Sequence, residues 1–147
     1  MKKNRFLVAV LVTLALGVLS MPLASCSGEV SFTTARLSEV TMAHGVDDSL
    51  RPVGPADTFA VDTPEIYLSA KFSNAPSETE IASEWIYVEG EAVGYENTLI
   101  DSVSIEVSGT DYIYFALPMP QGWPRGEYAV KLYIDGKEAE TATFTIE

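Results

Sequence analysis

Residues that commonly carry metal or nucleophile chemistry are almost missing from this chain. Its 147 residues include one cysteine, Cys26, and one histidine, His44. One cysteine cannot form a disulfide within the chain, and a zinc site needs several Cys or His ligands at close spacing. A Ser-His-Asp triad would depend on His44, and no Gly-x-Ser-x-Gly turn is present to hold a nucleophile. We therefore expect a protein that is not an enzyme and has no metal or cofactor, with His44 as a solvated loop residue.

Positive charge is also scarce. The chain has nine lysines and arginines against 21 aspartates and glutamates, a net charge of −12. Three of the nine lie in residues 2–5, so residues 26–147 hold six basic and 21 acidic residues, a charge of −15. The phosphate backbone of a nucleic acid would be repelled, and so would an anionic membrane surface. We expect no nucleic acid partner, and we interpret the charge as an aid to solubility.

A long apolar run occurs only at the start of the chain. Basic residues in positions 2–5 precede an apolar stretch over about residues 6–19, and small residues come after it. This order is typical of a secretory signal. The stretch is shorter than the roughly 20 residues that a membrane-spanning helix needs, and Pro22 lies just beyond its end. We predict a signal peptide over residues 1–25; the alternative is a retained N-terminal membrane helix.

The sequence Leu23-Ala24-Ser25-Cys26 resembles the lipobox of bacterial lipoproteins. The resemblance implies that a diacylglycerol is attached to the Cys26 sulfur, that the chain is cut just before this residue, and that the new N-terminus is acylated. A cysteine thiolate is a suitable nucleophile, and stable anchoring needs more than one acyl chain. Ser27 at the next position implies the outer membrane, in a cell that has one. We predict a lipid-anchored protein of the bacterial cell envelope that faces the periplasm or the cell exterior.

Residues 26–34 are mostly small or hydroxyl-bearing and show little periodicity. We interpret them as a tether, which a lipid-anchored domain needs in order to stand away from the membrane. The remaining residues, 35–147, have the length of one domain.

Hydrophobic residues in this domain alternate with a period of two, which is typical of β-strands. In Glu65–Ser73, for example, every second residue from Ile66 to Phe72 is apolar. Asp135-Gly136 predicts a two-residue hairpin turn with positive φ. Seven strands are predicted in all, at Arg36–Ala43, Glu65–Ser73, Glu80–Val88, Thr98–Val107, Asp111–Leu117, Glu127–Ile134 and Lys137–Ile146.

Seven short strands separated by turns favour a β-sandwich. Trp85 lies in the third strand, and Gly126-Glu127-Tyr128-Ala129-Val130 resembles a tyrosine corner, with Val130 where the second cysteine would stand. The chain thus resembles immunoglobulin-like or fibronectin type III-like domains. We predict an all-β, seven-stranded antiparallel immunoglobulin-like β-sandwich without a disulfide. Residues 122–128 are also similar to uncharacterised bacterial surface lipoprotein domains, a family that implies no activity.

Aromatic residues outside the predicted core are candidates for ligand binding. Trp123 lies in the Pro- and Gly-rich segment 118–125, and Tyr133 is predicted to point away from the core. Aromatic platforms of this kind bind sugars or peptides. The alternative is that Trp123 folds back beside Tyr128 and closes the bottom of the sandwich.

The connection Gly45–Pro64 is long for a loop inside a compact domain, and such loops are usually functional or packed. Phe59 is its candidate binding residue and could also anchor it over an open end of the sandwich. The segment contains Asp47, Asp48, Asp57 and Asp62. Carboxylates alone can bind calcium; the alternative is a solvated acidic loop.

Three functions are compatible with these features. We favour a non-catalytic binding or adaptor module on the envelope, monomeric, with a protein or glycan partner. A second hypothesis is an accessory or inhibitor subunit of an envelope enzyme. A third is an envelope hydrolase that uses paired carboxylates, such as Glu89 with Glu91 or Glu138 with Glu140. Acidic pairs are also typical of sheet edges that resist aggregation.

Overall fold

The protein is described by a computed structural model that covers residues 32–147. The predicted signal peptide, Cys26 and most of the predicted tether lie outside these residues, so the predictions made on them stay predictions. The described part is all-β, as predicted. Its strands are β1 (Arg36–Val46), β2 (Pro52–Pro55), β3 (Thr58–Phe59), β4 (Glu65–Gly90), β5 (Thr98–Pro118), β6 (Gly126–Ile134) and β7 (Lys137–Ile146). Between residues 32 and 147 we find no helix of the length and apolarity needed to cross a membrane.

All seven strands belong to one hydrogen-bonded sheet. Its order is β2-β1-β4-β6-β7-β3, and β5 pairs with β4 beside this path. The strand pairs are antiparallel except β3 with β7, which is parallel and joins Thr58 to Thr145. The prediction of a purely antiparallel sandwich of two separate sheets is therefore not met. The reason is that strands β4 and β5 carry hydrogen bonding from one layer into the other.

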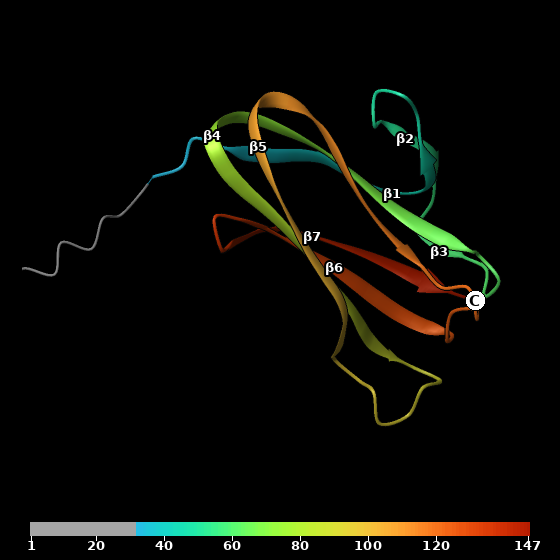
Figure 1. The fold of residues 1–147 in the computed structure, drawn as a ribbon. Helices are drawn as coiled ribbons and strands as arrows, with labels where there is room; N and C mark the ends of the chain where they lie inside the picture. The colour runs from blue at the N-terminus through green and yellow to red at the C-terminus, as the bar shows by residue number, and fades with distance from the viewer. Residues whose placement is uncertain (1–31) are drawn as a thin grey trace, which may run out of the picture. The chain divides into compact units, whose positions relative to one another are not determined.

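Strand β4 has two arms, which the sequence analysis predicted as separate strands. Its first arm, 65–73, pairs with β1 and with the end of β5; its second arm, 79–90, pairs with β6 and with the start of β5. Figure 1 shows β4 and β5 turning over together at one end of the domain. Asn74 (φ 54°) and Glu78 (φ 63°) on β4 and Gly109 (φ 83°) on β5 form this bend. Bulged residues of this kind redirect a strand without ending its ladder.

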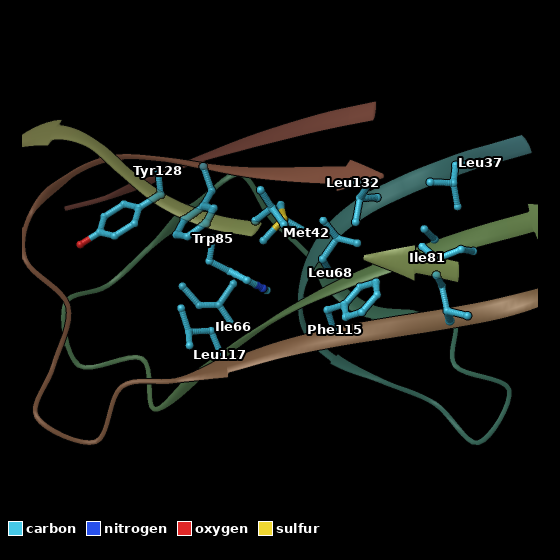
Figure 2. Packing of buried hydrophobic residues seen from close by; sticks show 14 of the residues in the cluster. Leu37, Met42, Ile66, Leu68, Ile81, Trp85, Phe115, Leu117, Tyr128 and Leu132 are labelled. Atoms are coloured by element: carbon cyan, nitrogen blue, oxygen red, sulfur yellow. The ribbon is translucent and has the colours of Figure 1, made fainter. Parts of the chain in front are cut away.

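The bend folds the sheet over, so that its two halves face each other across the core. Figure 2 shows side chains from both halves meeting in this space. The alternation in residues 66–72 is confirmed as an inward face, since residues 66, 68, 70 and 72 on β4 are buried. Residues 128, 130, 132 and 134 on β6 are buried as well. Trp85 is buried in the middle of the core, as the immunoglobulin-like resemblance implied. The labelled core residues are Leu37, Met42, Ile66, Leu68, Ile81, Trp85, Phe115, Leu117, Tyr128 and Leu132.

The turn between β6 and β7 is the predicted two-residue hairpin. Ile134 pairs directly with Lys137, and the two residues between them, Asp135 and Gly136, have φ values of 48° and 79°. Positive φ at both positions defines the tight turn whose twist matches that of the strands.

The segment Gly45–Pro64 is not the long loop that was predicted. Strand β1 continues through His44 to Val46, and β2 returns beside it as a hairpin. The Asp47 carboxylate accepts hydrogen bonds from the backbone N–H groups of Ser49 and Arg51, both at 2.9 Å. The Ser69 hydroxyl then donates to the Leu50 carbonyl at 2.7 Å and ties the hairpin to the sheet. These polar contacts order the segment without a regular apolar pattern, which is why periodicity did not reveal them.

Candidate functional site

Two segments far apart in sequence meet at the end of the domain opposite the bend. The Trp123 N–H donates to the Val61 carbonyl at 2.8 Å, and the Met119 N–H donates to the Pro64 carbonyl at 2.9 Å. We call the surface formed by residues 60–64, 89–98 and 118–125 the loop end. The two regions that the sequence analysis selected for binding therefore share one surface.

The indole of Trp123 and the ring of Phe59 face the core at the loop end. Each residue is 2% exposed. Trp123 packs edge-on against Tyr128 (ring centroids 5.4 Å apart) and Phe144 (5.8 Å), and Phe59 packs edge-on against His44 (4.8 Å) and Phe144 (5.8 Å). Both candidate residues are thus part of the core beneath the loop end. Trp123 folds back beside Tyr128, which was the alternative to an exposed binding platform.

Hydrogen bonds from these aromatic residues hold the loop backbone in place. The Trp123 indole N–H donates to the Thr63 carbonyl at 2.8 Å. The Tyr128 hydroxyl donates to the Pro124 carbonyl at 2.6 Å, which is the bond expected of a tyrosine corner. Burial, with a smaller contribution from nearby Tyr87, raises the pKa of Tyr128 well above its ordinary value. The phenol therefore stays protonated as a donor at physiological pH.

A close approach of two backbones forms one wall of the loop end. Gly90 and Gly126 pair at the ends of β4 and β6, with φ values of 152° and 150°. A Cβ on Gly90 would lie 2.2 Å from the Arg125 carbonyl oxygen, and one on Gly126 would lie 2.2 Å from the Glu89 carbonyl oxygen. Glu91 adds two bonds to this wall: its N–H donates to the Arg125 carbonyl (2.9 Å) and its carboxylate accepts from the Arg125 N–H (2.8 Å).

A cleft of about 700 Å³ with mixed polar and apolar walls opens at the loop end. Asp62, Glu91 and Arg125 contribute its charged groups, and Met119 and Pro124 form part of its wall. Within residues 32–147 the only ion pairs join Lys71 to Glu39 and Lys131 to Glu138. The Arg125 guanidinium thus has no internal ion pair in the described part of the chain and is available to a ligand.

An apolar pocket of about 270 Å³ lies beside the cleft and shares Met119 and Pro124 with it. Its walls are almost entirely apolar, and Tyr87, Tyr95 and Tyr128 supply its aromatic surface. Tyr95 is 63% exposed at the rim. Sequence reasoning missed this pocket, because its walls come from four separate parts of the chain. The available signal in the sequence was Tyr95, an aromatic residue between the strands predicted at Glu80–Val88 and Thr98–Val107.

Tyr133, the third predicted binding residue, lies elsewhere. It sits near the bend end of β6, opposite Ala82 on β4, and its hydroxyl donates to the Glu84 carboxylate at 2.7 Å. This hydrogen bond, followed by desolvation, raises the pKa of Tyr133 to about 12. The structure thus joins Trp123 and Phe59 at one end of the domain and leaves Tyr133 near the other.

The acidic side chains considered for metal binding or hydrolysis either form other contacts or lie apart from one another. Among residues 32–147 no three His, Cys, Asp or Glu side chains come together as metal ligands would. Glu138 forms an ion pair with Lys131 at 3.6 Å. In the other proposed pair, Glu89 with Glu91, Glu91 forms hydrogen bonds with the backbone of Arg125. Asp62 and Glu91 are the carboxylates that line the cleft.

Comparison with known proteins finds structures with a similar fold but gives no activity for this chain. No protein family matches this sequence, and no curated protein does either. In structure the chain is similar to an immunoglobulin-like protein of Pseudomonas aeruginosa, with 12% identity, a TM-score of 0.53, and coverage of 77% of this chain and 96% of that one. It is also similar to part of the alkylpurine DNA glycosylase AlkC of Pseudomonas fluorescens, with 13% identity, a TM-score of 0.50, and coverage of 77% of this chain but only 30% of the glycosylase. The first of these likenesses indicates an immunoglobulin-like fold.

Proposed function

We propose that this protein is a lipid-anchored binding protein of the bacterial cell envelope, whose immunoglobulin-like domain binds a protein partner at the loop end without catalysis. The anchor is predicted on Cys26, in the lipobox-like sequence at residues 23–26. Acyl chains at this position would provide the membrane affinity that the acidic domain lacks.

The observation that carries the proposal is the apolar pocket joined to a charged cleft. Protein interfaces commonly combine a buried apolar anchor with a polar rim. The apolar pocket has room for one large apolar side chain, and Arg125 and Asp62 beside it could pair with charges on the same partner. A glycan would need polar groups for its hydroxyls, which the walls of this pocket hardly offer. A protein partner is therefore favoured over a glycan.

The direction of the chain supports the same proposal. Arg36 pairs with Ser73 at the bend, where the Thr34 hydroxyl also donates to the Asn74 carbonyl at 2.8 Å. Glu65, at the other end of the same arm, pairs with Pro118 beside the cleft. The chain therefore enters the domain at the bend, at the end opposite the loop end.

Site-specific crosslinking tests the binding surface. A photo-reactive residue placed at Tyr95 should capture one protein on intact cells, and the same residue at Val53, which is 51% exposed on β2, should not. The captured protein is then purified and titrated against the wild type, Tyr95→Ser, Arg125→Gln and the control Val53→Ser. We expect the first two substitutions to weaken binding and the third to leave it unchanged. Equal loss in all three variants, or binding that soluble envelope glycans abolish, would contradict the proposal.

Cell fractionation and mass spectrometry test the anchor separately. The wild type should appear in the membrane fraction with a mass that shows cleavage before Cys26 and added acyl chains. Cys26→Ser should be released or should keep its leader. A Cys26→Ser variant that has the wild-type mass and membrane fraction would refute the lipidation without affecting the binding site.

The hydrolase hypothesis has its own test, because Asp62 and Glu91 line the same cleft. The Glu91 carboxylate already accepts a hydrogen bond from the Arg125 N–H, and this structural use favours binding over catalysis. We expect no turnover of envelope glycan fragments by the wild type. Turnover that Asp62→Asn removes would support the hydrolase instead.

A further inference from the structure

We propose that the free edge of β5 is a second docking surface, which accepts an extended peptide segment with alternating basic and apolar side chains as an added strand. This surface is distinct from the loop end and has a different chemistry. Strand addition of this kind uses backbone hydrogen bonds for affinity and side-chain pockets for specificity.

The first observation is the length of unpaired backbone. Strand β5 has 21 residues, and within residues 32–147 it pairs with β4 alone. The bend divides β5 into a first arm, 98–107, and a second arm, 109–118, and the other edge of both arms presents N–H and C=O groups without strand partners. An edge of this length is a ready template for another strand.

The second observation is an open seam in the core beside this edge. Val103 pairs with Ser83, so their side chains lie on the same face of the sheet. Ser83 is fully buried there, yet Val103 is 43% exposed. The seam is a cavity of about 330 Å³ that Ile105 on the first arm of β5 and Tyr114 on its second arm also line. An apolar side chain from an added strand would cover Val103 and complete the core face.

The third observation is a polar group without a partner inside this seam. The Ser83 hydroxyl is buried, lines the cavity, and has no hydrogen-bond partner in the described part of the chain. Buried polar groups are nearly always paired, so an unpaired one calls for an explanation. A donor or acceptor on the inserted segment would supply the missing bond.

Charge identifies the kind of segment that fits. Strand β5 contains Asp101, Glu106 and Asp111 and no lysine or arginine, and Glu65 lines the seam. Pairing two copies of β5 would bring like charges near each other across the strands, which is destabilising. A basic segment would instead be attracted. The charge pattern therefore favours a basic peptide over a second copy of this chain.

The test uses the purified full-length protein in detergent and a capped eight-residue peptide of alternating lysine and valine. Titration of the labelled peptide should saturate, and hydrogen exchange should slow in residues 98–118. A peptide of the same charge with alternate backbone nitrogens methylated cannot form the ladder and should bind at least about tenfold more weakly. A glutamate–valine peptide should show no binding.

Variants locate the contact. Ser83→Ala removes only an unpaired hydroxyl, so it should fold as well as the wild type, and it should bind this peptide equally well, because a valine side chain offers the hydroxyl no partner. Val103→Ser at the surface of the seam should bind the peptide about threefold to tenfold more weakly, and Asp101→Asn with Glu106→Gln should weaken binding about tenfold. Val53→Ser on β2 should have no effect. A tenfold change corresponds to about 1.4 kcal/mol of binding free energy.

Three results would overturn the proposal. The methylated peptide could bind as tightly as the parent, which would show charge attraction without strand pairing. Protection could fall outside β5. Sedimentation could show a dimer that protects β5 without peptide, in which case a second copy occupies the edge.

Discussion

The tyrosine corner allows the stability of the loop end to be tested with a single oxygen atom. Tyr128→Phe removes the hydroxyl that donates to the Pro124 carbonyl at 2.6 Å and keeps the ring. The ring contacts with Phe144 (stacked, 5.0 Å) and Trp123 should therefore persist. Any loss of stability then comes from the lost hydrogen bond and from the Pro124 carbonyl, which no longer has a donor.

The expected loss follows from burial. Tyr128 is almost fully buried. An intramolecular hydrogen bond contributes about 0.5–1.5 kcal/mol net, and a buried partner left unpaired costs about 1–3 kcal/mol. Pro124 lines both the cleft and the apolar pocket, so we expect water to reach part of its carbonyl. We expect Tyr128→Phe to lower the free energy of unfolding by about 1–2 kcal/mol.

Tyr133→Phe is the matched control. It removes the same atom from a hydroxyl that donates to Glu84 at 2.7 Å, but Tyr133 is only partly buried, so water can replace the bond. Urea denaturation followed by tryptophan fluorescence gives the free energy of unfolding of each variant. The comparison is valid if this free energy falls with urea concentration at the same slope in both. An unchanged Tyr128→Phe variant, or a larger loss in Tyr133→Phe, would refute the assignment of a structural role to the corner.

Three further predictions concern the same region and the rest of the domain. Gly126→Ala should lower the free energy of unfolding by about 1–3 kcal/mol from backbone strain alone, and the 2.2 Å contact of the new Cβ with the Glu89 carbonyl should lower it further. Gly94→Ala is the control, because Gly94 also has a positive φ but has open space around it. Trp123→Phe should cost about 1–3 kcal/mol, because it leaves the Thr63 carbonyl unpaired, and near-ultraviolet circular dichroism should confirm that the fold persists. The pKa of Tyr133 is raised from 10 to about 12, so the stability linked to its protonated form is complete below pH 10 and is lost as pH rises through 12. Denaturation across this pH range should therefore show a smaller loss of stability in Tyr133→Phe than in the wild type. An identical loss in both proteins would contradict the raised pKa.

The sequence predicted the elements whose cause is local. The inward face of β6 follows from strict alternation of residues 128–134, and the β6–β7 hairpin follows from Asp135-Gly136, because only a few residue types accept positive φ. The tyrosine corner was also predictable, since its donor and acceptor are four residues apart. In each case neighbouring residues supply the whole physical reason.

The sequence did not reveal where strands continue or which segments meet. Residues 65–73 and 80–88 have the pattern of two strands, because Asn74 and Glu78 interrupt the alternation at the bend, yet the ladder runs through both. The order in Gly45–Pro64 depends on Asp47 and on Ser69, which lies 19 residues from its bond partner Leu50. Pairing across such separations leaves no periodic trace.

By itself, then, the amino-acid sequence determined the all-β class, the core faces and the tight turn, since each depends on side chains a few residues apart. It also predicts acylation at Cys26, which lies outside the described residues. Only the tertiary structure decided that Trp123 is a support and not a platform, that Met119 and Pro124 divide a cleft from an apolar pocket, and that β5 has an open seam above Ser83. Those features arise because the bend in β4 and β5 brings distant backbone together, and the shape of that space depends on all the side chains that fill it.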